Sequence, residues 1–162
     1  MNQEILKSKQ ETVAKISESL KGCASLTIVE YRGLTVAQIS DLKKLLKAAG
    51  STFSVYKNTL FSRASDELGY KDLEQYLSGS NAFVFSDQLS SGPKVLAKFA
   101  RRNENLVIKA GIAEGKVYDA SGMKTLATLP DKNGLLSMFL SCLNAPIQKF
   151  AATVKAVADS KN

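Results

Sequence analysis

The sequence contains no histidine and no tryptophan, and it has only two cysteines, Cys23 and Cys142. Without histidine the chain lacks the usual near-neutral general base and the commonest metal ligand, so histidine-dependent hydrolase triads are excluded. The two cysteines lie far apart and form neither a zinc-binding spacing nor a disulfide framework, which favours a reducing cytosol. We therefore expect no enzyme active site, no bound metal and no cofactor.

Long hydrophobic runs are also missing, and none approaches the roughly 20 residues that a membrane-spanning helix needs. The first residues are polar and include Glu4, Lys7 and Lys9, which is unlike a secretory signal. Hydrophobic residues make up 44% of the 162 residues and charged residues 23%. These values are typical of a soluble protein with one packed core, to which a further segment is appended.

Acidic residues are scarce in one stretch. Between Arg32 and Arg63 six bases face the single acid Asp41, and this difference supplies +5 of the net charge of +7. The rest of the chain is close to balanced. A concentrated surplus of this kind is typical of a surface that binds a polyanion, and we expect that polyanion to be a nucleic acid.

The pattern around this stretch predicts alternating strands and helices. Residues 3–20 have the spacing of an amphipathic helix, and 25–31 and 52–57 have the β-branched and aromatic bias of strands. Thr35 and Gln38 form a capping-box pattern before a helix that Gly50 ends. In that helix we expect a buried face, and we expect the lysines to point outward. The face comprises Val36, Ile39, Leu42, Leu45, Leu46 and Ala49.

Later elements complete the fold. Asn58 or Thr59 is expected to cap a helix ending at Gly69, and 81–86 is expected to be a third strand. Further expected elements are a helix from Pro93 to about Asn103, a hairpin of residues 106–113 and 116–118, and a short helix capped by Ser121. The fold class is α/β: a small mixed sheet covered by helices, with an extended C-terminal amphipathic helix.

The positions of the bases suggest how a phosphate is bound. Arg32 and the pair Lys57 and Asn58 each lie where a strand leads into a helix, so their side chains, free amides and helix dipoles can converge on phosphate oxygens. In the alternative reading, Asn58 is only a helix cap and the lysines form only a solvated face. For Arg101 and Arg102, at the end of a helix, a structural role is at least as well supported as an RNA contact.

After Pro130 the sequence carries a stripe of large apolar residues in alternating steps of four and three. Its members are Leu136, Leu140, Leu143, Ile147, Phe150, Val154 and Val157. Such a seam is typical of a helix that packs against partner helices, and Pro146 is expected to kink or split it into two short pieces. Packing on the chain's own sheet and docking on a membrane are the alternatives. The weak basic face argues against a membrane.

Several motifs together resemble one family over essentially the whole chain, the bacterial large-subunit ribosomal protein number ten family, whose members form the base of the ribosomal stalk. The matching segments are YRGLTVAQISDLKKLLKAAG (31–50), VYKNTL (55–60) with Arg63, residues 77–87, LATLP (126–130) and LLSMFLSCLNAP (135–146).

The resemblance implies a cytoplasmic ribosomal protein with two parts. Residues 1–130 would form a domain that binds the GTPase-associated region of large-subunit rRNA, beside ribosomal protein number eleven. Residues 131–162 would form a helical spine for dimers of the acidic stalk protein, numbers seven and twelve, and its length suggests two dimers. Translation GTPases would be recruited indirectly. The residues implied at the rRNA are Tyr31, Arg32, Gly33, Lys43, Lys47, Lys57, Asn58, Thr59 and Arg63, and those implied at the dimers are the seven residues of the stripe.

A second hypothesis is a non-ribosomal RNA-binding assembly module that self-associates through its C-terminal helix. If this second hypothesis is correct, the isolated chain forms concentration-dependent oligomers without an added partner. A ribosomal protein whose helix binds another protein does not.

Overall fold

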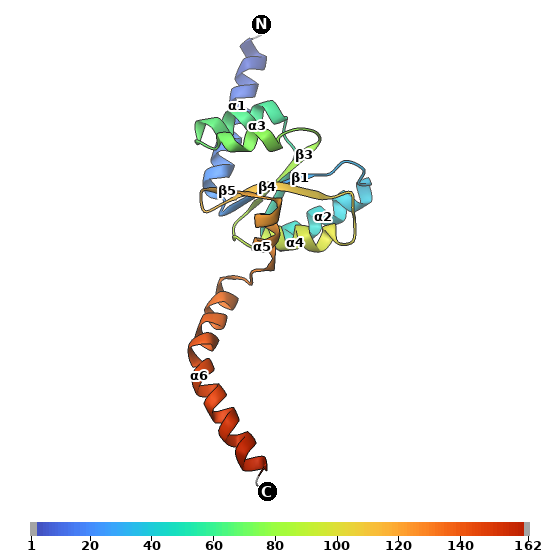
Figure 1. Ribbon diagram of the computed structural model, residues 1–162. Coiled ribbons are helices and arrows are strands. Elements are labelled where there is room, and N and C mark those ends of the chain that lie inside the picture. Colours follow the sequence, from blue (N-terminus) through green and yellow to red (C-terminus); the bar gives the residue numbers. More distant parts are fainter. Residues whose placement is uncertain (1–2, 161–162) are drawn as a thin grey trace. The chain divides into compact units, whose positions relative to one another are not determined.

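The computed structural model describes residues 3–160 and divides the chain into two units, Met1–Leu129 and Pro130–Asn162 (Figure 1). Each unit is described by itself. Unit 1 contains the sheet and all helices but one. Unit 2 contains a single long helix.

Unit 1 is organised on a five-stranded sheet with the strand order β2-β3-β1-β4-β5. The strands are β1 (Ser25–Glu30), β2 (Ser51–Ser54), β3 (Asn81–Ser86), β4 (Val107–Ala113) and β5 (Lys116–Asp119). Every pair of neighbours is antiparallel, so the expectation of a mixed sheet is wrong in this detail. Because β3 lies between β1 and β2 and is antiparallel to both, β1 and β2 run in the same direction. Their carboxyl ends therefore lie at the same edge of the sheet.

Two layers of helices cover the two faces of this sheet, as Figure 1 shows. One layer consists of α1 (Gln3–Gly22), α3 (Asn58–Glu67) and the 3-10 helix η1 (Lys71–Tyr76). The other consists of α2 (Val36–Ala48), α4 (Ser91–Ala100) and α5 (Ala120–Thr128). The expected fold class, helices over a small sheet with a long C-terminal helix, is confirmed.

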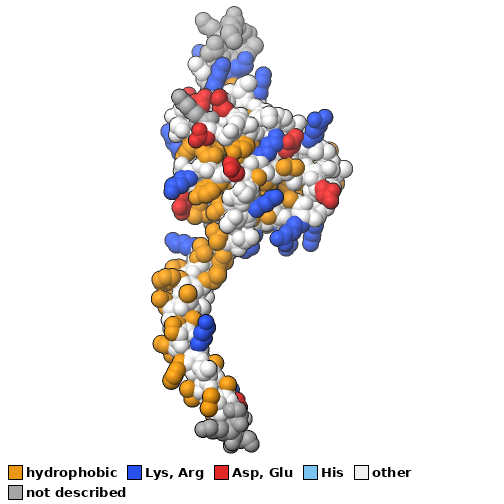
Figure 2. Space-filling model, viewed as in Figure 1, with side chains coloured by type: hydrophobic (Ala, Val, Ile, Leu, Met, Phe, Trp, Pro, Cys, Tyr) orange, Lys and Arg blue, Asp and Glu red, His pale blue; other side chains and the backbone are white. Residues whose placement is uncertain are grey.

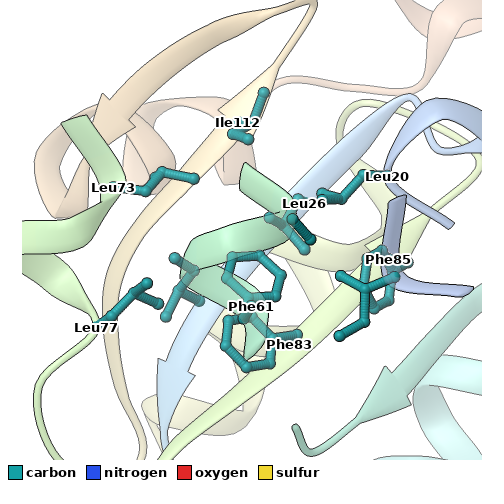
Figure 3. Close-up of a cluster of buried hydrophobic side chains, with 11 residues drawn as sticks. Leu20, Leu26, Phe61, Leu73, Leu77, Phe83, Phe85 and Ile112 are labelled. Carbon is teal, nitrogen blue, oxygen red and sulfur yellow. The ribbon is translucent and has the colours of Figure 1, made fainter. Parts of the chain in front are cut away.

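The layer of α1, α3 and η1 packs on the sheet through an aromatic cluster (Figure 3). The rings of Phe61 on α3 and Phe83 on β3 are stacked with centroids 3.8 Å apart, and Tyr56 lies 6.2 Å from Phe83. Burying a side chain of this size stabilises the fold by about 1.5 to 3 kcal/mol. This packing fixes where α3 begins relative to the sheet.

On the other face, Leu42 and Leu46 of α2 are fully buried with residues of β1, β3, α4 and α5. The buried face of α2 is narrower than the sequence pattern predicts. Val36 is 82% exposed and Leu45 51% exposed, so their assignment to the core is wrong. Both have the helical spacing of core residues. However, no neighbouring element among the described residues covers the first turn or the outer side of α2.

Local sequence signals fixed several boundaries correctly. Thr35 accepts from the amide of Gln38, and the Gln38 side chain accepts from the amide of Thr35, which is the predicted capping box. The hairpin of β4 and β5 turns at Glu114 (φ 51°) and Gly115 (φ 76°), and two successive positive φ angles suit a tight two-residue turn. Ser121 does not cap α5, because the helix already begins at Ala120 after Asp119.

Unit 2 is the helix α6 (Lys132–Ser160), which continues through Pro146. The expectation of two separate pieces is therefore wrong, and Figure 1 shows α6 as one bowed ribbon. Proline at this position cannot donate to the carbonyl oxygen of Cys142, so one backbone hydrogen bond of the helix is missing. A gap of one bond bends a helix without ending it.

Candidate functional site

The sheet edge where β1 and β2 end brings together the candidate residues that the sequence predicts at strand ends. Arg32 follows β1 and Lys57 follows β2, and both side chains are exposed. The loop before β3 links them: the amide of Tyr31 donates to the carbonyl oxygen of Ser80 (3.3 Å), and the side-chain amide of Asn58 donates to that of Gly79 (2.9 Å). We call the residues around this loop, Tyr31–Gly33, Lys57–Thr59 and Ser78–Ser80, the β1/β2 edge.

Gly33 shapes the turn that presents Arg32. Its φ of 91° lies in the left-handed region, and its carbonyl oxygen accepts a 3.0 Å hydrogen bond from the side chain of Asn105. A Cβ atom at this position would lie 3.2 Å from Cγ of Asn105, so a larger residue would disturb both the backbone and this contact. Tyr31 packs half-buried against the core under α2. Tyr31 and Gly33 therefore fix the backbone on both sides of Arg32.

Two helices of ten or more residues start at this edge. The first-turn amides of α2 are capped by Thr35, whereas α3 starts after Lys57 with no side-chain cap. Asn58 and Thr59 do not cap α3, which corrects the sequence expectation, because the Asn58 side chain reaches across to Gly79. The uncapped amides of α3 and its positive helix end thus lie beside Lys57, an arrangement that favours an anion.

The remaining bases of the sequence cluster are not gathered there. Lys43 and Lys47 lie on the outer side of α2, and the Lys43 ammonium lies 5.6 Å from the ring centroid of Phe53. Lys44 pairs with Asp41 at 3.7 Å. Arg63 is exposed on α3, which covers the opposite face of the sheet. The structure therefore separates a cluster that is compact in sequence into one edge and two faces.

Lys109 also lies at the β1/β2 edge, and sequence analysis missed it. Its ammonium donates to the carboxylate of Glu30 and to the carbonyl oxygen of Ser78, each at 2.7 Å. Its side chain is only 18% exposed, so its charge is neutralised by Glu30 and it supports the loop. No pattern in the sequence marks this contact, because it joins residues that are far apart along the chain.

The second candidate site is the apolar stripe of α6. Its seven predicted residues have exposed fractions between 54% and 72%, and their order along the helix is Leu136, Leu140, Leu143, Ile147, Phe150, Val154 and Val157. Figure 2 shows the apolar side chains along α6 in orange. Large side chains exposed over the length of a helix are typical of a surface that a partner covers.

The first half of α6 carries more apolar surface than the stripe alone. Leu135, Met138 and Phe139 are exposed beside it, at 44%, 61% and 62%. At roughly 100° per residue, the apolar arc covers about 200° of the helix before Pro146 and about 80° after it. The segment LLSMFL was part of the resemblance, but the heptad pattern hides these extra residues because they lie outside the steps of four and three.

Two side chains in unit 1 have shifted acidities. Burial raises the pKa of the Cys23 thiol, which donates to the carbonyl oxygen of Leu20 at 3.3 Å. The hydrogen bond from Tyr76 to Asp119 raises the pKa of Tyr76, since the carboxylate favours the protonated phenol. Cys23 lines a cavity of about 270 Å³ together with Tyr70 and Glu114. Within residues 3–160 no cluster of three or more metal-ligating side chains is found, and no helix is long and apolar enough to span a membrane.

Comparison with known families decides what these surfaces belong to. The model of the family described as Ribosomal protein L10 matches residues 4–101, more than half of the chain. The chain belongs to the ribosomal protein L10 family. A second family model, the ribosomal protein uL10 C-terminal region, matches residues 129–162 and so contains the whole of α6.

Individual relatives support this membership over the full length. The large ribosomal subunit protein uL10 of Macrococcus caseolyticus (strain JCSC5402) is 47% identical over 162 residues, covering 99% of this chain and 94% of the relative. Those of Shouchella clausii (strain KSM-K16) and Bacillus cereus (strain B4264) are each 45% identical over 158 residues, covering 97% of this chain and 95% of each relative. Membership of the ribosomal protein L10 family makes the chain a structural protein of the large subunit of the cytoplasmic ribosome, and not an enzyme.

Proposed function

We propose that this chain forms the base of the ribosomal stalk. Unit 1 anchors it on the GTPase-associated region of large-subunit rRNA, and α6 carries dimers of the acidic stalk protein, numbers seven and twelve. The stalk dimers in turn recruit GTP-bound translation factors, so the chain acts on translation GTPases indirectly. The exposed apolar stripe along the 29 residues of α6 is the observation that carries this proposal.

The energetic argument for a partner on α6 is direct. Each of the seven stripe residues gains roughly 1.5 to 3 kcal/mol when it is buried, and steps of four and three are the spacing of a helix packed against other helices. Leu135–Leu143 and Ile147–Val157 lie on either side of Pro146. We assign one stalk dimer to each segment.

The β1/β2 edge supports the RNA-binding half of the proposal. Arg32 and Lys57 are exposed there beside the uncapped first turn of α3, and the loop of residues 78–80 holds the two sides together. Phosphate oxygens suit cationic side chains and free helix amides at once. Lys43, Lys47 and Arg63 lie elsewhere on unit 1, so within this proposal they bind other phosphates than those held at the edge.

The same end of the sheet also exposes apolar side chains. Val36 at the start of α2 is 82% exposed, and Val107 at the start of β4, which pairs with Glu30, is 50% exposed. Apolar surface beside a cationic site suits a neighbouring protein better than a phosphate backbone. This observation supports a contact with ribosomal protein number eleven at this end of unit 1.

The RNA contact is tested with the double variant Arg32→Gln/Lys57→Gln of the full chain. Each lost phosphate contact lowers the slope of log K against log salt by roughly 0.9, so the double variant should lower it by about 1.8. The matched control is Lys21→Gln/Lys116→Gln, which removes the same charge from exposed positions away from this edge. Binding of an rRNA fragment that is equal for the two variants would refute the assignment.

The contact with the stalk dimers is tested by coexpression with the acidic stalk protein. The full chain should copurify with it, whereas the variant Leu140→Glu/Phe150→Glu should lose it and still bind RNA. Copurification that survives this double substitution would place the partner elsewhere. Concentration-dependent oligomers of the chain without any partner would instead support self-association through α6.

A further inference from the structure

The two helical layers of unit 1 differ in charge. The layer of α2, α4 and α5, including the two arginines that follow α4, carries eight bases and one acid, Asp41. The layer of α1, α3 and η1 carries six bases and seven acids. A surplus of +7, equal to the net charge of the whole chain, therefore lies on one face of the sheet.

The bases of this face are exposed and spread over all three helices. They are Lys43, Lys44, Lys47, Lys94, Lys98, Arg101, Arg102 and Lys124. Figure 2 shows blue side chains gathered along the part of unit 1 that α2 and α4 cover. In the sequence this surplus is hidden, because five of the eight bases lie outside the stretch from Arg32 to Arg63, in a region where acids on other elements balance them.

Arg101 and Arg102 directly follow α4, the helix that contacts both α2 and α5. Arg102 and Lys44 line a hollow of about 440 Å³ between α2 and α4. Arg101 and Lys124 line another of about 460 Å³ between α4 and α5. Among the described residues, no ion pair is found for either arginine. If the two arginines only stabilised the end of α4, there would be no reason for each of them to line a hollow together with a lysine of a neighbouring helix.

The chemistry of the face indicates what it binds. Helices packed side by side are 8 to 10 Å apart, so three of them give bases spread over roughly 20 Å in each direction. The large apolar side chains that are exposed on the described part of this face are aliphatic, Val36 and Leu45, so no stacking platform for unpaired bases is present there. If the partner were an acidic helix, bases along a single groove would be enough to bind it. Bases over a broad face without aromatic residues suit the phosphates of a duplex.

We propose that the exposed face of α2, α4 and α5 is a second RNA-binding surface, which contacts the phosphate backbone of double-stranded RNA through Arg101, Arg102 and Lys124 together with the lysines of α2. It is distinct from the β1/β2 edge. The inference rests on the proposed function only in taking RNA as the polyanion. It adds Arg101, Arg102 and Lys124, which neither the family resemblance nor the strand-end argument assigns, to Lys43 and Lys47, which the resemblance already implies at the rRNA.

The test uses the full chain with the triple variant Arg101→Gln/Arg102→Gln/Lys124→Gln and a blunt RNA duplex of about 20 base pairs. Three lost phosphate contacts should lower the salt slope by roughly 2.7 and the affinity at low salt by about tenfold or more. The matched control is Lys15→Gln/Lys21→Gln/Lys116→Gln, which removes three exposed charges from other parts of unit 1. A charge-conserving variant, Arg101→Lys/Arg102→Lys, should keep most of the slope.

The outcomes separate this inference from the proposed function. A triple variant that binds like its control overturns the second surface, while the loss caused by Arg32→Gln/Lys57→Gln would still support the edge. If the triple variant loses binding to polyglutamate but binds RNA as its control does, the face binds an acidic protein, and the inference is also overturned. If the triple variant unfolds at a lower temperature than its control, the inference is tested instead by acetylating the lysines of the wild-type chain with and without the RNA duplex. Lys98 and Lys124 should be protected by the duplex, and equal labelling with and without RNA contradicts the inference.

Discussion

The side-chain amide of Asn58 donates a 2.9 Å hydrogen bond to the carbonyl oxygen of Gly79, and so joins the start of α3 to the loop before β3. The same loop accepts hydrogen bonds from the amide of Tyr31 and from Lys109. The relative positions of Arg32 and Lys57 thus depend on three contacts to residues 78–80. The sequence predicts that Asn58 or Thr59 caps α3. In the structure the start of α3 is instead held by residues 78–80, which are distant in the sequence.

Replacing Asn58 by Ala should destabilise unit 1 and weaken RNA binding. A hydrogen bond of this kind contributes about 1 kcal/mol to the free energy of unfolding, and without it the loop is held by two contacts instead of three. Urea denaturation should show this loss, and RNA affinity should fall although no charge has changed. Thr59→Ala is the control for the stability measurement alone, since Thr59 is exposed and adjacent. Equal stabilities of the two variants would contradict this role of Asn58.

Single glutamates in the two halves of α6 should each remove one stalk dimer. Leu140→Glu places a charge in the first proposed site and Phe150→Glu in the second, and a buried unpaired charge opposes association by several kcal/mol. The mass of the copurified complex should fall by one dimer in each variant. Loss of both dimers from either variant would show that the two segments form a single site.

Matched controls for these variants lie on the opposite side of the helix. Ser141 and Gln148 are exposed and are roughly 130° to 150° from the centre of the stripe. Ser141→Glu and Gln148→Glu introduce the same charge in the same halves of α6. Both should keep two dimers.

Replacing Pro146 by Ala should raise the helicity of the free chain. Alanine restores the donor to the carbonyl of Cys142, and proline inside a helix costs about 3 kcal/mol relative to alanine. The circular dichroism signal at 222 nm should increase and RNA affinity should stay the same. An unchanged signal would show that α6 is already limited by something other than the missing bond.

The two cysteines should differ in reactivity toward iodoacetamide. Cys142 is exposed on α6, whereas Cys23 is half-buried and its thiol pKa is raised by that burial. Because the thiolate is the nucleophile, a raised pKa lowers the reactive fraction at pH 8, so Cys142 should be alkylated first. The neutral thiol favours the fold below its unfolded pKa, and this contribution is lost as pH rises through the folded value. Equal rates in the native chain would contradict the burial of Cys23.

Local features of the fold could be predicted from sequence because their causes are local. The capping box of Thr35 and Gln38 and the turn at Glu114 and Gly115 depend on residues only a few positions apart. The stripe of α6 could be recognised for the same reason, since its spacing alone defines one face of a helix. The motifs also sufficed to recognise the family.

Features that depend on distant residues could not be predicted. The insertion of β3 between β1 and β2 decides that Arg32 and Lys57 share an edge, and no local pattern encodes strand order. The exposure of Leu45 depends on where α4 ends, and not on the periodicity of α2. The basic face of α2, α4 and α5 is hidden in sequence, because its bases alternate with acids that the fold places on other elements.

The central claim is that α6 is a spine for two dimers while unit 1 holds RNA. The most direct test is native mass spectrometry of the complex formed by the full chain, the acidic stalk protein and an rRNA fragment. We predict one copy of the chain with four copies of the stalk protein and one RNA, and loss of the stalk protein alone in Leu140→Glu/Phe150→Glu. A complex that lacks the stalk protein, or a variant that loses RNA together with the dimers, would contradict the account.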